Sequence, residues 1–95
     1  MTEKMAEKST AKEIQRVIWH SRRGMLELDL AFSPFAKNVY ANLTAEEQAD
    51  YRRLLSCEDT ELFQWVLQAA KPDDPALAAM MEKILDYAKA NKASV

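Results

Sequence analysis

Residues 74–88 read DPALAAMMEKILDYA, and this stretch carries the clearest helical pattern in the chain. Asp74 and Pro75 suit the N-cap and the first position of a helix. The apolar residues that follow recur three and four positions apart, which places them on one helical face. We therefore expect a helix that begins at Pro75 and buries a stripe formed by Leu77, Met80, Met81, Ile84, Leu85 and Ala88.

Capping boxes predict the starts of two helices upstream of this one. In each, a Thr is followed three positions later by a Glu, so that each side chain can bind the other residue's backbone N–H. The first box is Thr10 with Glu13, and the second is Thr44 with Glu47. Apolar residues follow both boxes at helical spacing, which predicts one helix from each box.

Two more helices are expected between and after these. One begins directly after Gly24, and Pro34 should kink or briefly break it because proline removes a backbone donor. The helix before it should end near residues 22–24, with Gly24 in the left-handed conformation that closes many helices. Another helix should begin with Asp59 as its N-cap and end before Lys71–Pro72, because a residue preceding proline avoids the helical conformation.

The composition agrees with a single helical domain. The chain has 95 residues, of which 48% are hydrophobic and 29% charged, with one Gly and three Pro. So few turn-forming residues leave little room for a many-stranded β fold. The sequence therefore predicts an all-α protein, a compact bundle of about five short helices over residues 10–90. Residues 1–9 and 91–95 are expected to be flexible.

The same composition excludes several kinds of active site. Cys57 is the only cysteine and His20 the only histidine, which rules out an internal disulfide and a Cys/His zinc site. Gly24 is the only glycine, so no glycine-rich phosphate loop is present. His20 reads as a solvated helix-end residue and Cys57 as a small apolar filler. We expect no catalytic residue, no metal site and no enzymatic activity.

Charge and hydropathy point to a cytoplasmic protein. The net charge is −2, which does not favour nucleic acid as a partner, and no apolar run is long enough to span a membrane. The N-terminal residues do not resemble a signal or transit peptide.

One segment nevertheless has the features of a protein-docking point. Arg22 and Arg23 precede Gly24, and Glu27 falls in the first turn of the following helix. A glycine allows a partner to approach closely, and an arginine beside it offers a planar set of donors. The alternative is purely structural: Gly24 closes one helix, the arginines complement its C-terminus, and Glu27 caps the next helix. The residues alone leave both interpretations open.

The stretch WHSRRGMLELD, residues 19–29, resembles the signature of the succinate dehydrogenase flavinylation (FAD assembly) factors. That family is marked by an Arg-Gly-x-x-Glu motif, here Arg23, Gly24 and Glu27. The resemblance covers most of residues 14–85, and the segments before and after do not match. It continues in order through Pro34-Phe35, Tyr40, Leu43-Thr44, residues 54–59 and residues 62–66.

The resemblance implies a helical assembly factor that binds the flavoprotein subunit of succinate dehydrogenase, and also that of fumarate reductase. Such a factor promotes covalent attachment of FAD to a histidine of the partner, which holds the flavin, and no cofactor is expected on this chain itself. A different class of function would be a nucleic-acid-binding or regulatory module that uses Arg16, His20 and the Arg22–Arg23 basic cluster. The residues predicted to contact the partner are Arg23, Gly24, Glu27, Arg22, Asp29 and Trp19. For Trp19 and Trp65, a place at the edge of the core is the alternative.

Overall fold

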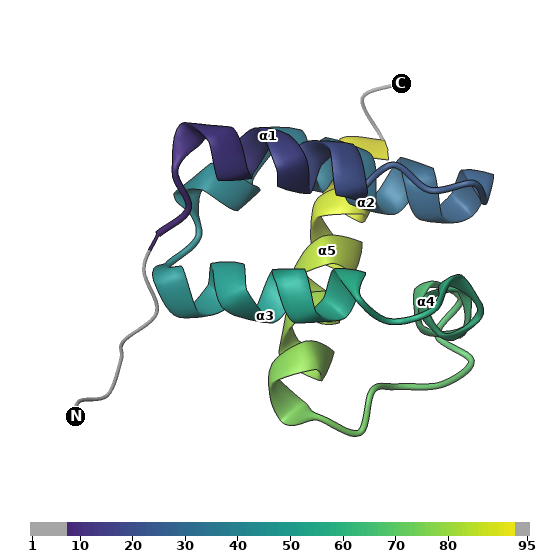
Figure 1. Ribbon diagram of the computed structural model, residues 1–95. Coiled ribbons are helices and arrows are strands. Elements are labelled where there is room, and N and C mark those ends of the chain that lie inside the picture. Colours follow the sequence, from purple (N-terminus) through teal and green to yellow (C-terminus); the bar gives the residue numbers. More distant parts are fainter. Residues whose placement is uncertain (1–7, 93–95) are drawn as a thin grey trace.

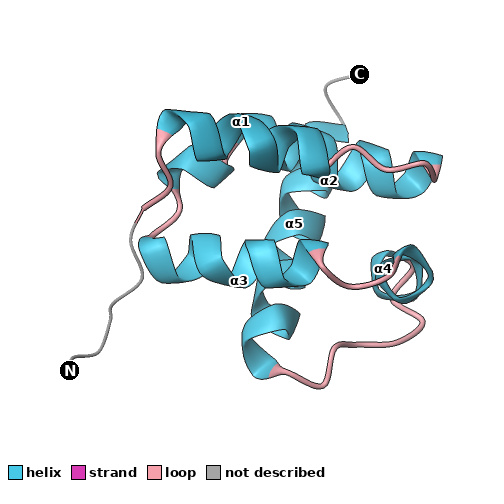
Figure 2. Cartoon of the chain, viewed as in Figure 1, coloured by secondary structure: helices cyan, strands magenta, loops and turns pink. Residues whose placement is uncertain are grey.

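The structure is a computed structural model that describes residues 8–92. Within that range the chain is all-α and contains no strand, as predicted (Figure 2). The elements are α1 (Ala11–His20), α2 (Leu26–Asn38), the short 3-10 helix η1 (Tyr40–Asn42), α3 (Ala45–Leu55), α4 (Asp59–Val66) and α5 (Pro75–Lys92). The sequence did not predict η1.

Helix α5 is the centre of the bundle. It packs against α2, α3 and α4, and α2 in turn contacts α1, η1 and α4 (Figure 1). Large apolar side chains from α2, η1, α3, α4 and α5 fill the space between these elements with almost no solvent exposure. The most deeply buried of them are Leu28, Phe32, Phe35, Tyr40, Tyr51, Leu54, Leu62, Met80 and Ile84.

The predicted helix starts are largely confirmed. Thr10 and Thr44 both form their capping boxes, in which the Thr hydroxyl accepts a hydrogen bond from the Glu N–H at 3.2 and 3.1 Å. Asp74 caps α5, because its Oδ1 accepts a hydrogen bond from the N–H of Ala76 at 2.9 Å. Each of these caps satisfies a backbone donor that a helix start leaves unpaired.

The predicted N-cap of α4 is wrong by one residue, and the helix ends before Lys71–Pro72 as predicted but for a different reason. Glu58, not Asp59, is the N-cap, and Asp59 is the first helical residue. The helix ends at Val66, well before Pro72, and Gln68 takes a positive φ of 62° just beyond it. A residue in that conformation ends a helix without any proline.

Pro34 neither breaks nor divides α2, which runs as one helix through it. Buried residues lie on both sides of the proline: Ala31 and Phe32 precede it, and Phe35 and Ala36 follow it. A proline inside a helix costs about 3 kcal/mol. We infer that burial of both halves of α2 in the same core offsets that cost.

Contacts of the helical domain extend to Ser9, which precedes Thr10. The N–H of Ser9 donates to Oε1 of Gln48 at 2.8 Å, and its hydroxyl lies 2.6 Å from that of Tyr40. At the other end α5 continues to Lys92, past the expected limit of residue 90. Residues 1–7 and 93–95, which fall within the segments expected to be flexible, lie outside the described residues.

Candidate functional site

The linker between α1 and α2, residues 21–25, begins at a buried and hydrogen-bonded residue. Ser21 is fully buried, and its hydroxyl donates to the carbonyl oxygen of Val17 at 2.7 Å. The same hydroxyl lies 2.8 Å from that of Tyr51 on α3. Burial raises the pKa of Tyr51 far above its usual range, so this phenol stays neutral and keeps its proton for hydrogen bonding. These hydrogen bonds therefore hold the end of α1, and with it the first residue of the linker, against α3.

The side chain of Arg23 turns inward rather than toward solvent. Its Nη1 lies 3.1 Å from Oδ1 of Asp59, and its Nη2 donates to the carbonyl oxygen of Leu55 at 2.6 Å. Only 12% of the side chain is exposed. The N–H of Arg23 donates to Oδ1 of Asp29 at 3.3 Å. Arg23 thus faces α3 and α4. The structural alternative required it to complement the end of α1, and it does not.

Gly24 is exposed and has no role in closing α1. That helix ends at His20 with Ser21 as its C-cap, and Gly24 does not have a positive φ. A Cβ built on Gly24 would meet no heavy atom of the described residues within 4 Å, apart from its chain neighbours. The predicted left-handed closure is therefore wrong, and the fold itself does not require a glycine at this position.

Glu27, like Gly24, has no structural role in the fold. It lies in the first turn of α2, as predicted, but the N-cap of that helix is Met25 and no side chain caps it. Glu27 is exposed, and it forms no hydrogen bond or ion pair with residues 8–92. Its carboxylate is left to complement the helix N-terminus and to face solvent.

Exposed apolar side chains flank these two residues. Leu26 and Leu30, one helical turn apart on α2, are 66% and 62% exposed. Trp19 near the end of α1 is 72% exposed, so its proposed place at the core edge is wrong. The guanidinium carbon of exposed Arg22 lies 5.5 Å from the centre of the Trp19 ring, within range of a cation–π contact. We call Trp19, Arg22, Gly24, Leu26, Glu27 and Leu30 the linker surface.

Sequence reasoning missed Leu26 and Leu30, although a signal was present. Both lie off the buried stripe of α2 that includes Leu28, so a leucine at each position has no core to fill. Exposed leucines are common individually, but two on one turn beside an open glycine are more typical of a binding site. The partners of Arg23, Leu55 and Asp59, were also missed because they come from other helices.

The two other residues considered for chemistry remain unremarkable. His20 is exposed at the last position of α1. Cys57 packs against the core, and burial together with the carboxylate of Glu61 raises the pKa of its thiol. A raised pKa lowers the thiolate fraction and hence the reactivity of a cysteine. In the described part of the chain, no three His, Cys, Asp or Glu side chains are placed to hold a metal ion.

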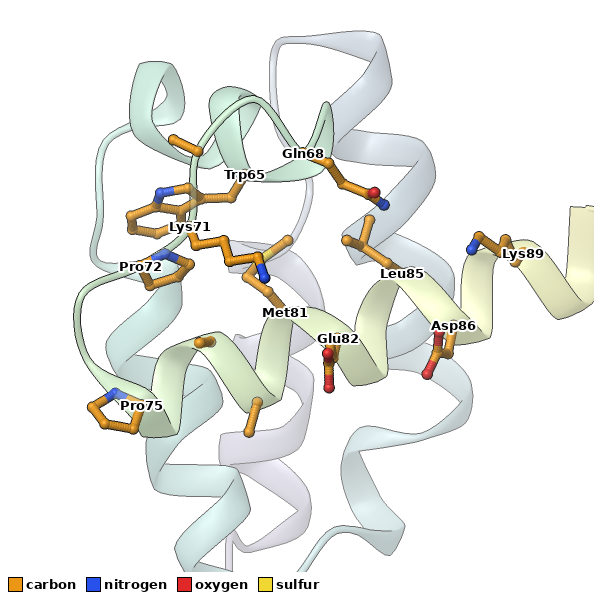
Figure 3. A pocket seen from close by; sticks show the side chains of 13 residues that line it. Trp65, Gln68, Lys71, Pro72, Pro75, Met81, Glu82, Leu85, Asp86 and Lys89 are labelled. Atoms are coloured by element: carbon orange, nitrogen blue, oxygen red, sulfur yellow. The ribbon is translucent and has the colours of Figure 1, made fainter.

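A shallow groove of about 620 Å³ lies elsewhere, between α5 and the segment that joins it to α4 (Figure 3). Trp65 and Pro72 line one side, and Met81 and Leu85 of α5 line the other. Trp65 is half-buried here and packs against the core, as the core-edge alternative predicted. None of the six predicted partner residues lines this groove.

The basic cluster of the nucleic-acid alternative is divided in the structure. Arg16, His20 and Arg22 are exposed, but Arg23 is paired with Asp59 inside the fold. Among the described helices, none is both long and apolar enough to cross a membrane.

The comparisons of this chain with a family model and with individual known proteins agree with one another. Residues 15–88 match the model of a family described as flavinator of succinate dehydrogenase. The chain is 51% identical over 74 residues to FAD assembly factor SdhE of Pseudomonas aeruginosa, covering 78% of this chain and 88% of that protein. The protein of the same name from Shewanella oneidensis is 49% identical over 71 residues, which is 75% of this chain and 87% of its own. That of Aliivibrio fischeri is 42% identical over 78 residues, 82% and 91% of the two chains.

Proposed function

Because this chain belongs to the family of flavinators of succinate dehydrogenase, we infer that it is an FAD assembly factor for that enzyme. It promotes covalent attachment of FAD to the flavoprotein subunit, and it is not itself an enzyme. The observation that carries this conclusion is the family match, which spans residues 15–88 and so includes nearly the whole helical domain. The residues that form the bond to the flavin belong to the partner.

The linker surface is the part of the molecule proposed to meet the flavoprotein. Two residues of the Arg-Gly-x-x-Glu motif, Gly24 and Glu27, lie on it without any contact that the fold needs. Leu26 and Leu30 add apolar area that docking would remove from water. An exposed carboxylate between apolar side chains suits a partner surface that is apolar and carries a basic group opposite Glu27.

Its contribution to the reaction would be orientation. Docking would hold a conformation of the flavoprotein in which the flavin and the acceptor histidine are aligned for bond formation. Correct alignment of two reacting groups can lower a barrier by about 7–11 kcal/mol in favourable cases. A flat or protruding surface is sufficient for this role, because the factor needs no pocket for the flavin.

The proposal also covers the cellular location of the protein and a second partner protein. The lone, free Cys57 is compatible with the reducing bacterial cytoplasm, where we place the protein. The flavoprotein subunit of fumarate reductase is proposed as a further partner, on the basis of the family resemblance alone.

The test is covalent flavin fluorescence of the flavoprotein subunit on a denaturing gel. The subunit is expressed in cells that lack this protein, and then in cells given the wild type, Gly24→Arg or Ala90→Arg. Ala90→Arg is the matched control, because it adds the same side chain at an exposed position of α5. We expect fluorescence with the wild type and Ala90→Arg only.

The two parts of the proposal fail separately. Equal fluorescence in all cells, including those without the protein, would refute the assembly role. Fluorescence restored equally by the wild type and both variants would keep that role but remove the linker surface from it.

A further inference from the structure

We propose that Asp59 is a positioning residue that sets the linker surface through Arg23, and that Arg23 acts inside the fold rather than on the partner. This rests on the proposed function of the linker surface. It assigns the three residues of the Arg-Gly-x-x-Glu motif to two different tasks: Gly24 and Glu27 meet the partner, and Arg23 holds the linker in place. We call the contacts of Arg23 with Asp59 and Leu55 the arginine clamp.

The arginine clamp joins the linker to the junction of α3 and α4. Leu55 is the last residue of α3, so its carbonyl oxygen has no partner within that helix and gains from a cation. Asp59 is the first residue of α4, where an acidic side chain is favourable. The guanidinium of Arg23 reaches both, with its Nη1 on Asp59 and its Nη2 on Leu55. One side chain thus ties the linker to the adjoining ends of two helices that lie 32 and 36 positions further along the chain.

The backbone of the linker is held from the other side. The N–H of Arg23 donates to Asp29, which lies on the first turns of α2. Arg23 is therefore fixed through both its side chain and its backbone, and Gly24 follows it directly. Figure 1 shows the linker running from the end of α1 to the start of α2. A linker fixed in this way loses little conformational entropy when a partner binds.

The burial of the clamp argues against direct contact between Arg23 and a partner. Its side chain is 12% exposed, whereas Asp59 is 39% exposed. The Nε of Arg23 is buried and has no acceptor within the described residues, and Nη1 and Nη2 bind Asp59 and Leu55. Turning this side chain outward to a partner would break its charge-assisted hydrogen bonds to Asp59 and Leu55. A lysine could not replace it, because a single ammonium lacks the fork that spans the two acceptors.

A double-mutant cycle tests whether Asp59 affects binding through Arg23. The affinity of the full chain for the purified flavoprotein subunit of succinate dehydrogenase, made in cells without this factor, is measured for the wild type, Asp59→Ala, Arg23→Ala and the double variant. If Arg23 acts only through the clamp, Asp59→Ala weakens binding about tenfold, as expected for the loss of one such bond. The double variant then binds no worse than Arg23→Ala alone. Wild-type affinity for Asp59→Ala, or losses that multiply in the double variant, would overturn the proposal.

Two controls keep the result specific. Glu46→Ala also removes an acidic side chain from the first turn of a helix, here α3, but Glu46 is exposed and makes no contact with Arg23, so this variant should bind like the wild type. Amide hydrogen exchange of the free protein gives a readout that needs no partner. Asp59→Ala should speed exchange of the Arg23 N–H, which donates to Asp29, at least tenfold, while Glu46→Ala should not change it. Unchanged exchange at the linker would refute the clamp even if the flavoprotein did not bind at all, and a wild type that fails to bind would count against the proposed function alone.

Discussion

Gly24→Ala should leave the protein as stable as the wild type or slightly more stable, while weakening its function. The new Cβ would find open space, and the position does not have the positive φ that penalises an alanine. Replacing a glycine at such a site stabilises a protein by about 0.4–1 kcal/mol, because the unfolded chain loses conformational freedom. For a domain of this size that corresponds to a rise in Tm of about 2–8 °C.

The assay pairs thermal unfolding, followed by circular dichroism, with in-gel flavin fluorescence of the flavoprotein. Alanine adds one methyl group at the point proposed for close approach, so flavinylation should fall, and Gly24→Arg should abolish it. Both variants should retain the helical spectrum. Ala90→Arg serves again as the control for a changed but distant surface.

The reasoning would be refuted by a loss of stability greater than about 1 kcal/mol in Gly24→Ala, since the structure shows nothing for the methyl group to disturb. That outcome would return Gly24 to a structural role. Full flavinylation by both Gly24→Ala and Gly24→Arg would instead mean that no partner approaches this glycine closely.

Three other substitutions or conditions test separate parts of the structure. Leu28→Ala should lower the free energy of unfolding by about 2–5 kcal/mol, because Leu28 is fully buried. Leu26→Ala, at an exposed position two residues away, should change the free energy of unfolding little and weaken flavoprotein binding instead. Urea denaturation measures the first effect and a binding titration the second. The N–H of Thr44 lowers the pKa of Glu47, so the ionised carboxylate stabilises the fold fully above the ordinary pKa of 4.5 and that contribution is lost as the pH falls through the lowered value. Glu47→Gln should therefore show a smaller loss of Tm between pH 6 and pH 3 than the wild type, and parallel curves would contradict this. Finally, burial raises the pKa of Cys57, so its alkylation by iodoacetamide at pH 8 should be slower in the native protein than in urea, and equal rates would show an accessible thiolate.

The helix starts could be predicted from the sequence because their signals are local. A Thr and a Glu three residues apart, as at Thr10 and Thr44, complete a capping box without help from the rest of the chain. Features decided by packing could not be predicted in the same way. Pro34 remains within a continuous α2 because buried side chains flank it, and α4 ends at Val66 through the backbone conformation of Gln68 rather than through a proline.

The same difference between local and long-range signals applies to the candidate site. The sequence singled out the segment 22–29, but it could not decide between docking and a structural role. The partners of Arg23 lie more than 30 positions away, at Leu55 and Asp59, and no local spacing reports such contacts. Likewise the exposure of Leu26 and Leu30 follows from the direction in which α2 packs.

The structure contradicts the structural roles expected for two residues of the motif and gives the third a different one. The structural interpretation required Gly24 to close a helix and Glu27 to cap one, and neither does so. Arg23, by contrast, does have a structural role, because it pairs with Asp59 instead of complementing the end of α1 as first expected. A binding surface needs side chains that the fold leaves unused, and it also needs a backbone that stays in place. Substitutions at Gly24 or Glu27 should therefore weaken binding without disordering the linker, whereas substitutions at Arg23 should change both binding and the order of the linker. This difference would identify which residue of the motif supports the others.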